Sequence, residues 1–334
     1  MTDTSAALAK SITLMGSKQT YFIARMMVDK DLTNDFFRAY AYFRWADDII
    51  DAPTSLDAPA ESEVKTSIDG SAQTRSQQIA FINRQKVLIE SLYRNERPED
   101  MQPEEEILAD LIKNDRGEDS GLQSFIRNMF AIIEFDALRS GSVISKEQLT
   151  WYTNCLAISV TDGLQYFIGN GQAYPDSDGR YLAAKGAHIA HLLRDTAQDT
   201  SDGFINVPRE YLDANGIKLE DVDSLPYRAW VQSRTKMARD YFREGKHYLD
   251  HLEVLRCKIV GYWYCARFEG VLGTIERDDY ILRTEYNERR RLSVWLKLAW
   301  LSVSITLRHI VHRVRRGSLR ATRNSSMKAK GTKQ

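Results

Sequence analysis

The residues best suited to chemistry are two groups of aspartates, each spaced for one face of a helix. In the first group, Asp47 and Asp51 are four residues apart, with Asp48 between them and Arg44 one turn earlier. Side chains four apart on a helix share a face, and like charges about 6 Å apart repel by ~3 kcal/mol at an effective dielectric near 20. A divalent cation removes that penalty, and Mg²⁺ prefers carboxylate and phosphate oxygens. The spacing therefore predicts metal ligands, with a solvated acidic helix end before Pro53 as the alternative.

The second group follows about 150 residues later, with Arg194 beside it, and steps three, four and four residues along one helical face: His188, His191, Asp195 and Asp199. A guanidinium suits phosphate oxygens. A histidine-based transition-metal site is the alternative, but the paired aspartates of the two groups favour a hard ion. We predict that the two helices face each other and hold Mg²⁺, or alternatively Mn²⁺, around a diphosphate.

Helical periodicity dominates the elements that must position these groups, and no stretch alternates strictly between apolar and polar residues. The predicted helices are 17–28, 31–52, 79–93, 104–113, 121–140, 146–170, 180–200, 227–255 and 258–277, followed by a basic amphipathic segment, 287–316. Residues 52–78 are rich in Ser, Thr, Asp, Ala and Pro and predict a loop or disordered insertion. We therefore expect an N-terminal segment (1–16), one domain (17–307) and a basic tail (308–334).

Composition favours a globular protein with a sizeable core, since 43% of the 334 residues are hydrophobic. Three cysteines without paired spacing argue against a disulfide framework, and no apolar run is long enough to span a bilayer. We expect a cytoplasmic protein without a nucleic-acid partner.

The predicted tail, residues 308–334, has nine Lys or Arg and no acidic residue. Peripheral contact with the cytoplasmic membrane face is one expectation for the C-terminal segment, and packing as the last helix of the bundle is the other; its predicted apolar stripe is Trp295, Leu296, Leu298, Ala299, Leu301, Ile305 and Leu307.

Both acidic motifs resemble those of the squalene/phytoene synthase family. Tyr40 through Asp51 is similar to the family pattern Y-A-x-x-R-x-x-D-D-x-x-D. Leu192 through Asp199, with the later Gly203, is similar to I-L-R-D-x-x-x-D and its following glycine. The resemblance spans roughly residues 17–297. It implies an all-α, single-domain isoprenoid-synthase bundle with a central apolar cavity.

The resemblance also implies roles for individual residues. It implies metal ligation by Asp47, Asp51, Asp195 and Asp199, supported by Asp48, and diphosphate contacts from Arg44 and Arg194. Tyr21 and Tyr40 fall where the family places aromatic residues near the reacting diphosphate. His188 and His191 stand where the family has Gln and Asn, so we expect them at the diphosphate as well. Being imidazoles, they are expected to make activity depend on pH near the ordinary histidine pKa of ~6.5.

The expected activity is an Mg²⁺-dependent, head-to-head condensation of two farnesyl or geranylgeranyl diphosphates through a cyclopropylcarbinyl diphosphate, giving a carotenoid, sterol or hopanoid precursor. Use of NADPH is left open. The chain departs from the family pattern at four positions, and these departures keep other functions open. Ile158 and Thr161 stand where the family has glycines, Phe268 where it has Tyr, and Glu285 where it has Arg. The alternatives are a terpene synthase that ionises a single prenyl diphosphate and a non-catalytic relative that assists assembly of another complex.

Overall fold

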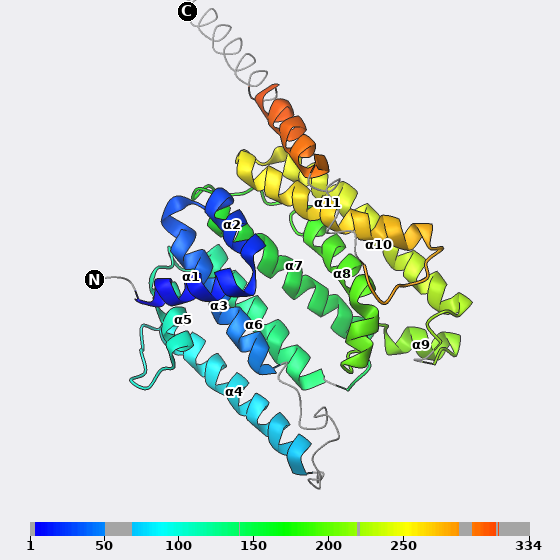
Figure 1. Ribbon diagram of the computed structural model, residues 1–334, viewed down its shortest axis with the longest axis horizontal. Helices are drawn as coiled ribbons and strands as arrows, with labels where there is room; N and C mark the ends of the chain where they lie inside the picture. The colour runs from blue at the N-terminus through cyan, green and yellow to red at the C-terminus, as the bar shows by residue number, and fades with distance from the viewer. Residues whose placement is uncertain are drawn as a thin grey trace, which may run out of the picture.

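The computed structural model describes residues 4–50, 69–139, 141–218, 221–286 and 296–311, together with Arg313, and these are almost entirely helical (Figure 1). The only β-type pairing in the described residues is an isolated bridge between Val143 and Ile205. The elements are α1 (Thr4–Gly16), α2 (Lys18–Met27), a 3₁₀ turn η1 (Lys30–Leu32), α3 (Thr33–Ile50), α4 (Asp69–Tyr93), α5 (Pro103–Lys113), α6 (Gly121–Arg139), α7 (Lys146–Ile168), α8 (Leu182–Ser201), α9 (Arg209–Asn215), α10 (Leu225–His251) and α11 (Leu255–Arg277). Residues 296–311 form a further helix.

The helices form one bundle in which α6, α7 and α8 lie side by side (Figure 1). On one side, α3 packs on α6, and α1, α2 and α5 pack on α3. On the other side, α10 and α11 pack on α8. The prediction of an all-α bundle is confirmed, and both helices that carry an acidic motif belong to it.

Short polar signals in the sequence set where the long helices begin. Ser145 starts α7 with a capping box, since its Oγ accepts the backbone N–H of Gln148 and the Gln148 side chain accepts the backbone N–H of Ser145. Ser224 caps α10 in the same way through the N–H of Tyr227. Such caps satisfy amide groups that have no partner inside the helix, and so fix the register of the residues that follow.

Small residues let α8 and α10 approach closely. A Cβ added to Gly245 on α10 would overlap the backbone nitrogen of Ala183 on α8. One added to Gly186 on α8 would stand 3.0 Å from the carbonyl oxygen of Ala238. Because backbone cannot yield as a side-chain tip can, this contact fixes α8 against α10.

Gly245→Ala is therefore expected to destabilise the protein by roughly 1–3 kcal/mol, the usual cost of overpacking a core. The matched control is Gly270→Ala on α11, where an added Cβ meets no atom within 4 Å and should stabilise by up to about 1 kcal/mol through helix propensity. Urea unfolding of both variants measures the difference. Equal stabilities would contradict the close contact between α8 and α10.

Three predicted boundaries are wrong. The N-terminal segment 1–16 is not separate, because α1 buries its small residues Ala6, Ala9 and Thr13, and Ser5 donates to Asp110 of α5. The predicted loop 52–78 is helical from Asp69, since α4 begins ten residues before the apolar period does; residues 51–68 lie outside the described residues. The basic tail predicted to start at residue 308 also begins inside a helix that runs to residue 311.

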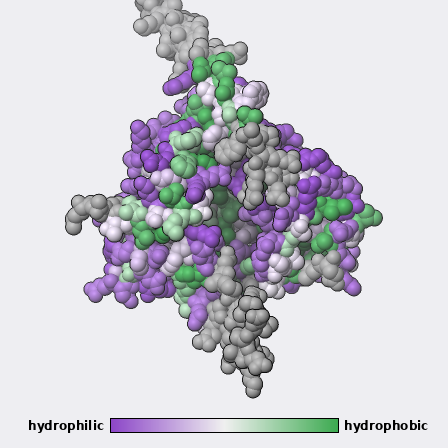
Figure 2. Space-filling model, viewed as in Figure 1, coloured by the Kyte–Doolittle hydropathy of each residue, from purple (hydrophilic) through white to green (hydrophobic). Residues whose placement is uncertain are grey.

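The middle of α7 is not fully covered by its neighbours. Ile158, Thr161 and Leu164 keep partial solvent exposure although α6 and α8 flank their helix. A hollow with hydrophobic side chains lies near the centre of the face shown in Figure 2. Partial exposure on this face of α7 is compatible with the apolar cavity that the family resemblance implies, and that cavity stays a prediction.

The helix of residues 296–311 has two apolar faces. One packs on α11, where Ile305 is buried and the indole N–H of Trp263 donates to Ser302 Oγ at 2.9 Å. The other face is exposed and is named here the exposed stripe: Leu296, Trp300, Val303, Leu307 and Ile310. Hydrophobic side chains are visible along this helix at the top of Figure 2. The expectation that the predicted stripe packs as the last helix is met only in part. Ile305 is buried and Leu301 packs on the core, whereas Leu296 and Leu307 are exposed and Trp295 lies outside the described residues. Among the described residues, no helix is both long and apolar enough to cross a bilayer.

Candidate functional site

The two acidic motifs lie at the same end of the bundle, one on each side of the last turn of α6. At the first turns of α4, Gln78 donates to the Ile50 carbonyl that ends α3, and Arg75 donates to the Leu138 carbonyl in the last turn of α6. After α6, Gly141 N–H donates to Gly203 O just beyond α8. Because these contacts join the C-terminal ends of α3, α6 and α8, both motifs open onto one region, as Figure 1 also shows.

On α3, Tyr40, Arg44, Asp47 and Asp48 follow one face at helical spacing. Arg44 Nη2 lies 2.5 Å from Asp48 Oδ1, and both side chains are about half exposed. The hydrogen bond to Asp48 raises the pKa of Arg44. Asp47 is exposed beside this pair, whereas the predicted ligand Asp51 lies outside the described residues.

The two predicted tyrosines occupy different places. An added Cβ on Gly16 would stand 3.2 Å from the Tyr40 hydroxyl, so Tyr40 lies under the junction of α1 and α2. Tyr21 is buried and stacks on Phe37 with ring centroids 5.3 Å apart. Because Phe37 precedes Asp47 by ten residues, the stack is about 15 Å from Asp47 along the helix axis. Tyr40 thus shares the face of the acidic motif, and Tyr21 does not reach it.

On α8, Asp195 is the centre of a charged cluster. Arg194 Nε donates to its Oδ1 at 2.5 Å, and His191 Nε2 lies 2.7 Å from its Oδ2. Burial alone would raise the pKa of Asp195, but the hydrogen bonds from Arg194 and His191 outweigh it and hold that pKa well below the usual range. Arg194 Nη1 is buried without a hydrogen-bond partner among the described residues. Asp195 is therefore a carboxylate across the pH range of ordinary assays.

His188 does not lie with the other members of its motif. It is 2% exposed, and its ring packs against Tyr152 of α7 at 4.9 Å. Burial lowers the pKa of His188 to about 3. The imidazole therefore stays neutral near pH 6.5, and the expectation that His188 makes activity depend on pH is wrong.

Asp199 occupies the last turn of α8, where its surroundings disfavour the ionised carboxylate. Asn206 Nδ2 donates to its Oδ2 at 2.8 Å. Burial, and next the negative charge of Asp195 one turn away, raise the pKa of Asp199 to about 7 against this donation. A cation at this position would favour the ionised form, because an opposite charge lowers the pKa of a carboxyl.

The structure adds Asp136 and Arg139 from the last turn of α6, which the sequence analysis missed. Arg139 Nε donates to Asp136 Oδ1 at 2.8 Å, and the Tyr152 hydroxyl donates to Asp136 Oδ2 at 2.8 Å. The Arg139 guanidinium is buried, lies 5.0 Å from the Phe204 ring, and its charge lowers the pKa of Asp199. The available signal was an acid and a base three residues apart in the last turn of the helix.

The donor set of the acidic end fits a hard cation. Asp47 and Asp48 on α3 and Asp195 and Asp199 on α8 offer carboxylate oxygens, and the buried Oδ1 of Asn206 has no hydrogen-bond partner in the described residues. Within those same ranges, no three acidic, histidine or cysteine side chains converge on one point. Mg²⁺ fits such a divided arrangement, because it is usually held by one or two carboxylates together with substrate phosphates.

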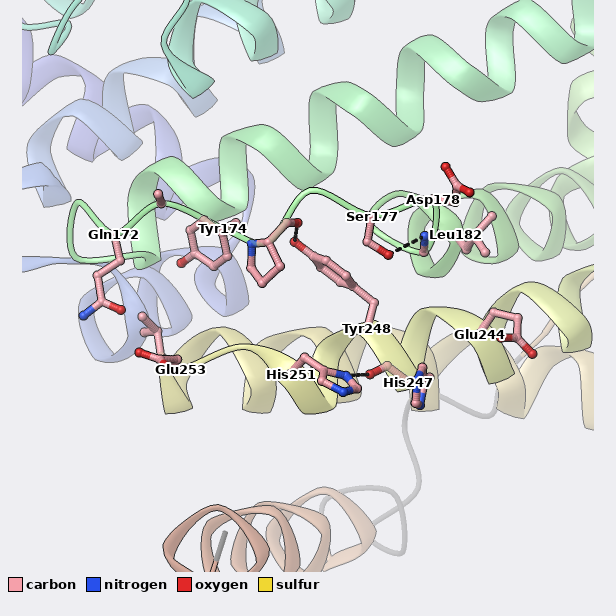
Figure 3. Close-up of a pocket in the computed structure, with 14 residues that line it drawn as sticks. Gln172, Tyr174, Ser177, Asp178, Leu182, Glu244, His247, Tyr248, His251 and Glu253 are labelled. Carbon is pink, nitrogen blue, oxygen red and sulfur yellow. Dashed lines mark hydrogen bonds between the residues drawn. The ribbon is translucent and has the colours of Figure 1, made fainter. Parts of the chain in front are cut away.

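A surface pocket of about 850 Å³ lies elsewhere, between residues 172–179 and the end of α10 (Figure 3). The Tyr248 hydroxyl donates to the Pro175 carbonyl at 3.2 Å and forms the wall between the two segments. His247 and His251 lie on the α10 side, with ring centroids 4.7 Å apart. The lining contains no residue of either acidic motif, so this pocket is distinct from the candidate site.

Comparison with known proteins gives a family match and two similar folds. A model of the squalene/phytoene synthase family matches residues 14–296. The crystal structure of squalene synthase HpnC from Alicyclobacillus acidocaldarius aligns with a TM-score of 0.62 and 17% identity, covering 84% of this chain and 96% of that one. A dehydrosqualene synthase solved in complex with a ligand aligns with a TM-score of 0.61 and 16% identity, covering 90% of this chain and 96% of that one. The curated proteins contain no sequence that matches this chain.

Proposed function

This chain belongs to the squalene/phytoene synthase family, and from that membership we propose that it joins two prenyl diphosphates head to head with release of diphosphate. The observation that carries the proposal is the retention of both aspartate motifs at one end of the bundle. The proposed substrates are farnesyl or geranylgeranyl diphosphate, and the proposed intermediate is a cyclopropylcarbinyl diphosphate. The predicted apolar cavity beside α7 would take the prenyl chains.

The contribution of the protein's own residues is electrostatic. Arg194 Nη1, buried and without a partner among the described residues, is available to donate to a diphosphate oxygen. Arg44 is paired with Asp48 at an exposed position, where an ion pair is worth ~0–1 kcal/mol and exchanges readily. Donors fixed where negative charge develops on a leaving group are usually the largest catalytic contribution.

Asp47, Asp195 and Asp199, supported by Asp48 and by Asp51 outside the described residues, would hold Mg²⁺ or Mn²⁺. When bound, the ion supplies Lewis-acid stabilisation of the leaving diphosphate. The proposal does not require NADPH for the release of diphosphate, and NADPH would supply a hydride only to the cation left when the second diphosphate departs.

Incubation with Mg²⁺ and either prenyl diphosphate, with and without NADPH, tests the proposal by mass spectrometry of the product and by assay of released diphosphate. The expected product contains two prenyl units, and two diphosphates are released for each product formed. A folded protein that releases no diphosphate from either substrate would exclude the synthase and favour the non-catalytic relative.

A single-substrate terpene synthase is the second candidate, favoured by residues around the predicted cavity beside α7. Ile158 and Thr161 are partly exposed on α7 where the family has glycines, and their side chains would narrow a cavity on that side of the helix. Phe268 is 4% exposed and packs edge-on against Tyr264 with ring centroids 5.2 Å apart, so it offers no hydroxyl where the family has Tyr. A product containing only one prenyl unit would support this candidate.

We further propose that the exposed stripe on residues 296–311 contacts a lipid surface. Leu296, Trp300, Val303, Leu307 and Ile310 are 52–71% exposed on one helical face, and the chain continues from this helix into residues 308–334 with nine Lys or Arg. Apolar side chains next to basic residues favour an anionic membrane surface. A hydrocarbon product that water does not dissolve would leave the enzyme at such a surface.

Trp300→Gln combined with Leu307→Gln should weaken co-sedimentation with anionic phosphatidylglycerol vesicles by at least about tenfold, since each buried apolar side chain is worth roughly 1.5–3 kcal/mol. The matched control changes Val87 and Leu225 to Gln, which are equally exposed but isolated on α4 and α10. Binding by the parent should fall with added salt. If both double variants bind as the parent does, the stripe has no role in membrane contact.

A further inference from the structure

The guanidinium of Arg267 on α11 has no carboxylate of its own in the part of the chain that the structure describes. Three arginines of α10 and α11 are paired with carboxylates: Arg239 with Glu276, Arg243 with Asp240, and Arg256 with Asp29. Arg234 and Arg277, like Arg267, have other partners, since Arg234 donates to Met237 Sδ and Arg277 to Thr274 Oγ1. Arg267 instead lies with its Cζ 5.3 Å from the ring centre of Phe268, the next residue. A cation–π contact of this kind leaves its N–H groups free to donate to another partner.

The Arg267 guanidinium lies close to the charged cluster of α8. Helix α11 packs on α8, and the ring of Phe268 is 6.0 Å from that of His191. Arg267 is exposed to solvent. Partial desolvation of its guanidinium, and next the positive charge of Arg194, lower the pKa of Arg267. Arg267 and Arg194 therefore repel each other across the interface between the two helices.

Local charge at this interface is unbalanced. Arg194 and Arg267 both lie near Asp195, the negative charge that the two share. A single carboxylate cannot offset two guanidiniums, and Asp195 is already bonded by Arg194 and His191. Two guanidiniums with free N–H groups, held on two rigid helices, form a site for an anion of more than one charge.

We propose that Arg267 and Arg194 together bind the diphosphate of a prenyl substrate. The inference rests on the proposed function, because it takes the anion to be the diphosphate of that reaction. Arg267 then supplies from α11 a second positive charge to the anion that Arg194 binds from α8, and the two helices pack together.

Calorimetric titration of inorganic diphosphate in the presence of Mg²⁺ tests this pairing. Arg267→Gln should weaken binding by about tenfold or more, as expected for the loss of a hydrogen bond between charged groups. Arg267→Lys keeps the charge but not the fork of donors and should recover part of the affinity. Arg243→Gln, which removes an exposed and already paired guanidinium of α10, should leave the affinity unchanged. Thermal midpoints of the two Arg267 variants should match the parent, because Arg267 loses no ion pair.

The outcomes separate this inference from the function it rests on. Equal dissociation constants for the parent and Arg267→Gln overturn the role of Arg267, while diphosphate binding by the parent leaves the proposed function in place. A loss in Arg267→Lys as large as in Arg267→Gln would show that positive charge at position 267 contributes nothing to binding, and also overturns it. If the parent neither binds diphosphate nor releases it from prenyl substrates, the proposed function fails and the inference fails with it.

Discussion

Asp195→Asn is expected to lower the rate of diphosphate release by about a hundredfold to a thousandfold while the bundle stays folded. The amide keeps the shape of the side chain but removes the negative charge that would hold Mg²⁺, and lost electrostatic stabilisation of this kind typically costs about 10²–10³ in rate. The measurement is released diphosphate per folded enzyme, with folding checked by circular dichroism. Asp47→Asn on α3 should show the same loss, because the two motifs are proposed to serve one cluster.

The control for both variants is Asp202→Asn, which removes a carboxylate just after α8, where Asp202 is exposed and accepts from Gln198. Its activity should equal that of the parent. The two active-site variants should differ in their free energy of unfolding. Asp195→Asn weakens the bond to Arg194 and should be the less stable, because Asp47 is exposed. Near-normal diphosphate release from either folded variant would remove the aspartates from the mechanism.

Asp199→Asn is expected to stabilise the metal-free protein above neutral pH by roughly 1–3 kcal/mol and to remove activity. The pKa of Asp199 is raised to about 7 in the folded chain, against about 3.9 in an unfolded one. Between these values the folded chain keeps a proton that the unfolded chain has released, so the free energy of unfolding falls as the pH rises through that interval. The amide carries no charge and escapes this loss.

Urea unfolding in EDTA at about pH 5 and pH 8 measures the effect. The stability of the parent should fall more between the two pH values than that of Asp199→Asn, and Asp202→Asn should follow the parent. Added Mg²⁺ should restore the parent at the higher pH, since binding to the folded state stabilises it. Parallel pH profiles for parent and variant would show that Asp199 is not held in a strained, partly buried position.

Sequence predicts the parts of this site that depend on spacing within one helix, and it misses the parts that depend on contacts between helices. Spacing along one helix is local, so Asp47 and Asp48, like Asp195 and Asp199, are found where a helical repeat places them. The facing direction of a side chain depends on which neighbours cover it. His188 is three residues from His191, yet it lies against Tyr152 of α7 while His191 faces Asp195. No property of α8 alone distinguishes them.

The same limit explains the wrong boundaries. In α1 the buried residues are the small Ala6, Ala9 and Thr13, while Leu8 and Leu14 point outward. A pattern search that weights large apolar residues therefore overlooks this helix. Asp136 and Arg139 were missed for a related reason, since a buried ion pair in an apolar helix resembles an ordinary surface pair until the packing around it is known.

The close contact of Gly245 with Ala183 has a consequence for how the site is assembled. Helix α8 is held by backbone contact with α10 and by packing against α7 and α11, so the half of the site with Asp195 and Asp199 is preorganised. The other half, with Asp47 and Asp48, lies exposed in the last turn of α3, where fewer neighbours restrict side-chain rotation. The entropy lost when a diphosphate joins the two halves therefore falls mainly on α3. The carboxylates of α8 are therefore the fixed part of the candidate site, and the side chains at the end of α3 are the part that would adjust to a ligand.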